Sequence, residues 1–161
     1  MANAFFGPPV DGFTPGGAHI TVYLIPVCER RLAVFDVEAR EARGRWLPWD
    51  VLEWGANPYE CASALADQWC DVALSDLALV DVMSFPVEGG GWELAIIFRA
   101  ELMETPKGDD VRTPFLFPEG QFDALGNFDP VDLARWVGVP LVSVESPPPP
   151  ADEPERPRLL F

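Results

Sequence analysis

The sequence predicts an α/β domain, α+β in its order of elements, in which a mixed β-sheet carries helices on its faces. Three observations lead to this prediction. Runs of β-branched and aromatic residues come in pairs, turn residues separate the members of each pair, and a single helical segment follows each pair. The 161 residues suffice for one domain with a core, and a hydrophobic content of 48% excludes a disordered chain.

The first pair of strands is predicted near the start of the domain. Residues 18–27 read AHITVYLIPV and residues 32–37 read LAVFDV, both typical of strands. Glu29, Arg30 and Arg31 between them predict the turn of a hairpin. The charged residues 38–45 are expected to form a loop.

A helix is predicted from Pro58 to Asp71, because Asn57 is a good N-cap and proline suits the first helical position. The remaining elements are two strands, a connecting turn, a long loop and a second short helix. They are expected at residues 77–85 and 92–102 (strands), 88–91 (turn), 104–128 (mostly loop) and 130–136 (helix after Asp129).

Both ends of the chain differ in composition from its middle. Residues 1–17 are rich in glycine and proline and predict an N-terminal arm, whose phenylalanines contact the domain. Residues 146–161 read SPPPPADEPERPRLLF and predict a disordered, proline-rich acidic tail. The domain itself is therefore expected to span residues 18–145.

Composition and charge exclude several classes of function. A net charge of −15 disfavours nucleic acid as a partner. No apolar run reaches the roughly 18–20 residues that cross a bilayer, and no secretion signal is visible, so a cytoplasmic protein without membrane contact is expected. Cys28, Cys61 and Cys70 are odd in number and form no C-x-x-C pair, which argues against disulfides and zinc.

Residues Gly44-Arg45-Trp46-Leu47-Pro48 resemble the R-x-W-x-x-P-G-G segment that leads into the Nudix box of Nudix (MutT-like) hydrolases. Asn57-Pro58 fits the start of the family's helix, and the later strands ending in IIFRAEL resemble its next hairpin. The resemblance covers residues 18–102, with 129–137 as a further helix. It implies a Nudix-like α/β/α sandwich with a mixed β-sheet.

The Nudix motif itself, G-x5-E-x7-R-E-U-x-E-E-x-G-U, fails in this register. Its glutamates hold Mg²⁺ or Mn²⁺, which require oxygen ligands, and the metal activates water against a pyrophosphate. The positions of the motif's chemical residues are taken by Asp50, Ala56, Ala64, Leu65, Gln68, Trp69 and Asp71. The resemblance therefore implies a degenerate Nudix box, with no catalytic residue, no metal ligand and no cofactor assigned.

The helix is amphipathic in a way that places former ligand positions on its apolar side. Spacings of 4, 7 and 11 residues put Leu65 and Trp69 on one face and Glu60, Asp67 and Asp71 on the other. Two interpretations stay open. Either Leu65 and Trp69 fill the old site as core, or they line an apolar groove with Trp49 that binds a ligand or a partner.

The candidate ligand-binding residues are accordingly Arg45, Trp49, Leu65 and Trp69, with Arg45 in a position that could meet substrate phosphates. The function expected is that of a non-catalytic pseudoenzyme that binds a small molecule, a protein or a second copy of itself. The alternative is a divergent Nudix hydrolase of nucleoside diphosphate-linked substrates, using relocated acids. Its candidates are Glu53, Glu60, Asp67 and Asp71.

Overall fold

A computed structural model describes residues 18–39, 43–87 and 91–142. The predicted N-terminal arm (residues 1–17), the proline-rich tail (residues 146–161) and most of the predicted turn at residues 88–91 lie outside the described residues. The elements in chain order are β1 (Ala18–Cys28), β2 (Arg31–Glu38), β3 (Arg43–Trp46), β4 (Trp49–Val51), α1 (Pro58–Leu65), the π-helical segment η1 (Ala66–Cys70), β5 (Leu74–Val87), β6 (Gly91–Leu102), β7 (Arg112–Leu116) and α2 (Pro130–Val137).

The seven strands formed by the described residues belong to one mixed sheet, ordered β3-β2-β1-β6-β5. Strand β1 runs parallel to β6 along nearly its whole length, while β5 and β6 form an antiparallel pair. Strand β4 pairs with the other edge of β1, and β7 pairs with β2. The β1–β2 hairpin turns at Glu29 and Arg30, both with positive φ, as tight hairpin turns require.

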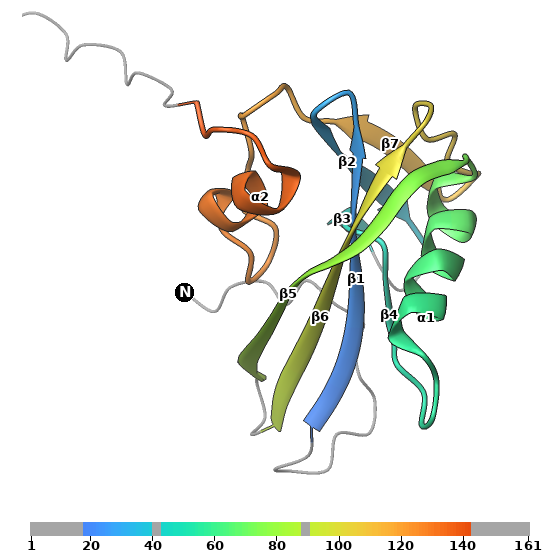
Figure 1. Ribbon diagram of the computed structural model, residues 1–161, viewed down its shortest axis with the longest axis vertical. Helices are drawn as coiled ribbons and strands as arrows, with labels where there is room; N and C mark the ends of the chain where they lie inside the picture. Colours follow the sequence, from blue (N-terminus) through green and yellow to red (C-terminus); the bar gives the residue numbers. More distant parts are fainter. Residues whose placement is uncertain (1–17, 40–42, 88–90, 143–161) are drawn as a thin grey trace, which may run out of the picture.

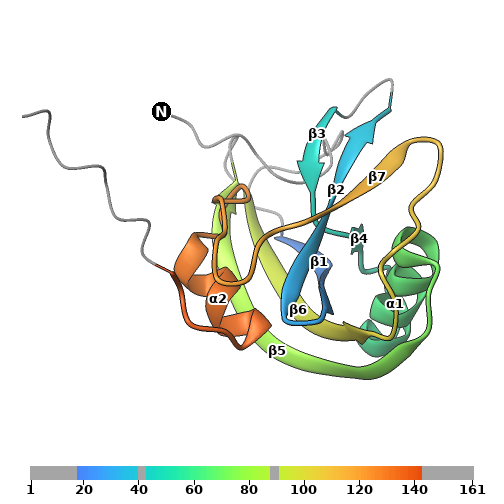
Figure 2. The same ribbon diagram turned by 90° about the horizontal axis from the view of Figure 1, so that it is seen from above.

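The two helices lie on opposite sides of the central strands, as Figures 1 and 2 show. One core cluster joins α2 to the sheet, with Leu133 and Trp136 packed around Tyr23 and Ile97. A second cluster joins α1 and η1 to the other face. This arrangement is the predicted α/β/α sandwich with a mixed sheet.

Both predicted helix starts are confirmed in atomic detail. The side chain of Asn57 accepts a hydrogen bond from the Tyr59 N–H at 2.9 Å, and that of Asp129 accepts one from the Asp132 N–H at 2.8 Å. Each cap is followed by proline. Helix α2 ends at Gly138, whose φ of 81° is left-handed. No helix in the described part of the chain is long and apolar enough to cross a membrane.

The short strands were the errors of the sequence-based prediction. Residues 43–45 were expected in a loop and belong to β3, and residues 112–116, within a stretch expected to be mostly loop, form β7. Both strands pair with β2, on its two edges. Such short segments carry weak local signals, and their pairing with a buried central strand decides their structure.

Candidate functional site

The helix face that would carry metal ligands is part of the core. The side chain of Leu65 is 2% exposed and that of Trp69 is 6% exposed. The Trp69 ring meets Phe35 of β2 edge-on, with ring centroids 5.5 Å apart. The structure thus places both residues in the packing that the core-filling interpretation describes, while a ligand-binding role for them stays a prediction.

The backbone at Asp71 supports the register deduced from the sequence. In that register Asp71 stands where the Nudix motif has its late glycine. Asp71 has a φ of 51° in the left-handed region, which glycine adopts freely and aspartate tolerates better than most residues. Its N–H closes the last wide turn of η1 on the Ala66 carbonyl at 3.2 Å. The backbone at this position is therefore one that suits the glycine of the motif.

The other ligand positions of the motif offer almost no oxygen donors. Ala56, Ala64 and Gln68 are exposed, and among them only Gln68 has a side-chain oxygen, a neutral amide. Mg²⁺ and Mn²⁺ need several hard oxygen ligands, usually including carboxylates. These residues therefore do not fit the metal that the fold family implies, and no catalytic step can be derived through it here.

Arg112 covers the ring of Trp69, which stands at a ligand position of the Nudix motif. The guanidinium of Arg112, from β7, lies 4.5 Å from the centre of the Trp69 ring. It also donates to the Gln68 carbonyl at 3.4 Å and to the Asp109 carboxylate at 3.0 Å. A cation over a tryptophan face is attractive, so Arg112 closes the outer side of this packing.

The acidic residues on the opposite helix face are exposed. Asp67 and Asp71 line a shallow polar hollow of about 360 Å³, together with Glu104 and Lys107. Glu53 and Glu60 are exposed and do not line it. Across residues 18–39, 43–87 and 91–142, no group of three or more His, Cys, Asp or Glu side chains is arranged to hold a metal ion.

Arg45 lies beside a second, more apolar pocket. Its guanidinium forms two hydrogen bonds with the Asp36 carboxylate, at 2.9 and 3.2 Å, across the β2–β3 pair. The hydrogen bond to Asp36 is also the main cause that raises the pKa of Arg45. The same guanidinium stacks 4.1 Å from the centre of the Phe115 ring and 5.8 Å from that of Phe117. Arg45 is therefore held in place by β2 and β7 together.

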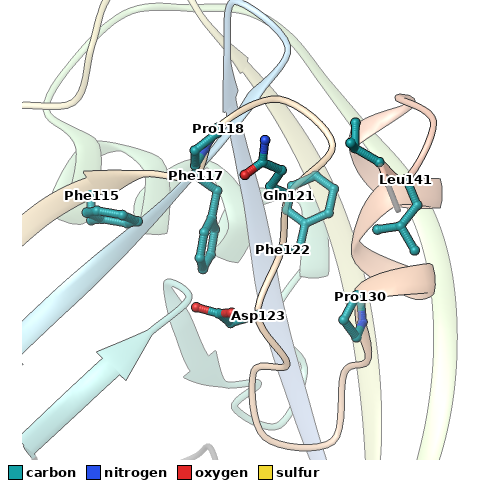
Figure 3. Close-up of a pocket in the computed structure, with 9 residues that line it drawn as sticks. Phe115, Phe117, Pro118, Gln121, Phe122, Asp123, Pro130 and Leu141 are labelled. Carbon is teal, nitrogen blue, oxygen red and sulfur yellow. The ribbon is translucent and has the colours of Figure 1, made fainter. Parts of the chain in front are cut away.

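This pocket, here called the aromatic pocket, has a volume of about 430 Å³. It is lined by Phe115, Phe117, Pro118, Gln121, Phe122, Asp123, Pro130, Leu141 and Val142. Figure 3 shows these side chains converging from β7, the following loop and the region around α2. Phe117 and Phe122 contact each other edge-on at 6.1 Å, and both are largely buried. The aromatic walls are thus fixed by core packing.

Sequence reasoning missed this pocket, because it treated residues 104–128 as loop. The one available signal was the density of aromatic residues in FLFPEGQF, residues 115–122. Trp49, the remaining predicted ligand-binding residue, is half-buried, and its ring centre lies 6.5 Å from that of Trp46. It packs against both core clusters and does not line the aromatic pocket. Of the four predicted ligand-binding residues, all within the described part of the chain, Arg45 is the one that contacts a wall of the aromatic pocket.

One buried polar pair lies under the sheet face that α2 covers. The Tyr23 hydroxyl donates to the Glu93 carboxylate at 2.7 Å, and Glu93 is 3% exposed. Burial first, and then the charge of Glu93, raise the pKa of Tyr23. Desolvation lowers the pKa of the nearby His19, against the opposing effect of Glu93. This pair is satisfied internally and joins β1 to β6.

No protein-family model matches the sequence, and no curated protein matches it. Solved structures do resemble it. A MutT Nudix hydrolase from Burkholderia pseudomallei is 16% identical with a TM-score of 0.58, over 72% of this chain and 95% of that one. The MutT protein from Methanosarcina mazei Go1 is 13% identical with a TM-score of 0.59, over 77% and 96% of the two chains.

A Nudix hydrolase from Nitrosomonas europaea is 16% identical with a TM-score of 0.55, and the match covers 81% of this chain and 78% of that one. Identities this low establish architecture and not activity. The matched part includes the mixed sheet and its helices, and all three neighbours are described as MutT or Nudix proteins. The chain described here therefore has the Nudix fold.

Proposed function

We propose that this chain is a non-catalytic Nudix-fold protein that acts by binding. The observation that carries the proposal is the burial of Leu65 and Trp69, which occupy positions where the Nudix motif has glutamates. A carboxylate at either position would be desolvated without a partner, which costs several kcal/mol. Restoring the motif would therefore require a different core, because the present packing depends on the apolar side chains.

The aromatic pocket is the site that best suits a ligand in this proposal. Its walls are phenylalanine rings, which favour a flat apolar group, and Asp123 and Gln121 supply polar atoms at its edge. Arg45 adds a positive charge beside Phe115. Because Arg45 is already paired with Asp36, its guanidinium would orient a ligand in the pocket but would add little net attraction for an anion.

The test of the non-catalytic part is a hydrolysis assay. The purified protein is incubated with Mg²⁺ or Mn²⁺ and a panel of nucleoside di- and triphosphates, dinucleoside polyphosphates and nucleotide sugars. We expect no product above the level of the metal-containing buffer. Robust turnover that disappears when a chelator is added would refute the proposal.

The test of the binding part uses the same panel without metal, followed by amide chemical shifts in nuclear magnetic resonance. Shifts grouped at Phe115, Phe122 and Asp123 are the expected result for any compound that binds. Asp123→Lys should abolish them, because it places a long cation at the pocket edge. Glu104→Lys makes the same change of charge outside this pocket and should leave binding intact. Equal effects of the two variants would argue against the pocket.

A second candidate function rests on the polar hollow beside η1. Asp67 and Asp71 line it with Glu104, and in a divergent hydrolase these acids would be the relocated metal ligands. Lys107 in the same hollow supplies a competing positive charge. If the hydrolysis assay detects activity, Asp67→Ala and Asp71→Ala should each remove it. Activity that survives both substitutions excludes this candidate.

A further inference from the structure

Helix α1 leaves part of its side of the sheet uncovered. Along β1, the helix packs on Val22 and Leu24, while Ile20 at the start of the strand is 39% exposed. In Figure 1 the lower ends of β1, β5 and β6 extend beyond both helices. Because side chains alternate between faces along a strand, the residues in register with Ile20 on β6 and β5 share this open surface.

The strand registers identify these residues. Ile20 pairs with Leu94 and Leu94 with Ser84, while Val82 pairs with Ile96 and Leu79 with Phe98. The exposed fractions are 56% for Leu79, 51% for Val82 and 42% for Trp92, and Leu94 and Ile96 are half-buried. We call the set Ile20, Leu79, Val82, Trp92, Leu94 and Ile96 the apolar sheet face.

The apolar sheet face contains no charged residue, although the chain has 26 acids and a net charge of −15. Ala18, Ser84 and Pro86 lie in the same rows and are uncharged as well, whereas Asp50 of β4, paired with Val22, marks the charged border of the face. Depletion of charge is what distinguishes the centre of a protein interface from ordinary surface. Apolar areas of a few hundred Å² on a protein surface are often functional, and an uncharged one suits a protein partner.

We propose that the apolar sheet face packs against the same face of a second copy of this chain. A two-fold interface needs a surface that complements itself, and an uncharged sheet face does so because two such faces stack about 10 Å apart. The acidic remainder of the surface repels a second copy. Association between two copies is therefore favoured at this face, where like charges do not meet.

Face-to-face packing fits better than pairing through the free edge of β5. That edge is interrupted by two β-bulges, between Leu74 and Asp76 and between Leu79 and Asp81, and Pro86 removes an N–H near its end. Bulges and proline are features that prevent edge-to-edge pairing. Asp81 moreover turns towards α2, where it binds Trp136 and Arg135, and leaves the opposite face free of its charge.

The size of the face sets the expected affinity. Four rows of residues about 6.6 Å apart, on three strands about 4.8 Å apart, span roughly 400 Å², of which α1 covers the part over Val22, Leu24 and Phe98. Stable interfaces bury about 800 Å² per partner, so flanking residues must contribute. Tyr59, which is 52% exposed and contacts Phe98 at the border of the face, is available for this. Interfaces smaller than the stable size are of the weak, transient kind, so we expect a dissociation constant of about micromolar magnitude.

The experiment measures the mass of the full chain in solution. Sedimentation equilibrium at about 100 μM, well above the expected dissociation constant, should give twice the chain mass of 17.8 kDa. Val82→Asp should weaken the dimer at least about 100-fold, because a two-fold interface then buries two unpaired carboxylates. Val131→Asp is the matched control, since Val131 is 63% exposed on α2, on the other side of the sheet.

Circular dichroism of both variants verifies that each remains folded, and raising the salt concentration adds an independent readout. Screening of like charges should strengthen association between two acidic copies, whereas it would weaken binding to a basic partner. A wild-type chain that stays monomeric at the highest concentration would overturn the proposal. So would a dimer that Val82→Asp and Val131→Asp leave equally intact, since the contact would then lie elsewhere.

Discussion

Shortening Leu65 to alanine tests whether the former ligand face of the helix is core or a binding groove. Leu65 is 2% exposed and belongs to the cluster that joins α1 and η1 to the sheet. Leucine-to-alanine changes in such positions cost about 2.7–5 kcal/mol, because the lost transfer energy adds to that of a cavity. We expect a loss of about 3 kcal/mol here, and a lower melting temperature by about 10 °C.

The measurement is thermal and urea-induced unfolding followed by circular dichroism, with no ligand added. Leu141→Ala serves as the matched control, because Leu141 is 42% exposed and the same atoms are removed. We expect the control to cost less than about 1 kcal/mol. A groove residue would behave like Leu141, so equal losses of unfolding free energy in the two variants would refute the assignment of Leu65 to the core.

Two further predictions concern ionisable groups. Hydrogen bonds from Trp136 and Arg135 hold the pKa of the Asp81 carboxyl below its usual range. Ionised Asp81 therefore stabilises the folded protein above pH about 4, and this stabilisation is lost as the pH falls through the pKa that Asp81 has in the folded protein. Asp81→Asn should therefore cost about 1 kcal/mol at neutral pH and progressively less in acid, and a pH-independent difference in urea unfolding would contradict this. Burial raises the pKa of Cys70 to about 12, and it also raises the pKa of Cys61. Because Cys61 is only half-buried, iodoacetamide should modify it before Cys70 in the folded protein, as measured by peptide mass spectrometry. Equal rates at the two thiols would show that Cys70 is not enclosed.

Much of the fold could be predicted from local sequence patterns. The first hairpin, both helix caps and the pair β5–β6 followed from short-range features, such as β-branched runs and an Asn-Pro or Asp-Pro start. The face of the helix that contains Leu65 and Trp69 followed from helical spacing alone. These predictions held because each depends on residues within a turn or two of one another.

The candidate pocket depended on contacts that sequence spacing does not contain. Arg45 was singled out from its motif, but its stacking on Phe115 exists because β3 and β7 pair with opposite edges of β2. The two residues are far apart in the chain, and β7 is too short to be recognised from its own residues. Only the pairing of strands brings them together.

The sequence by itself determined that alanine, leucine and tryptophan stand at the positions aligned with the Nudix ligands. Their side chains cannot bind a hard cation wherever they lie. The sequence also determined where the helix begins and which side is apolar, since both are local properties. The tertiary structure decided that Leu65 and Trp69 are enclosed, that an aromatic pocket forms beside Arg45, and that α1 is too short to cover the sheet. Burial is a relation between segments, and it is settled only when strands distant in sequence take their places beside one another.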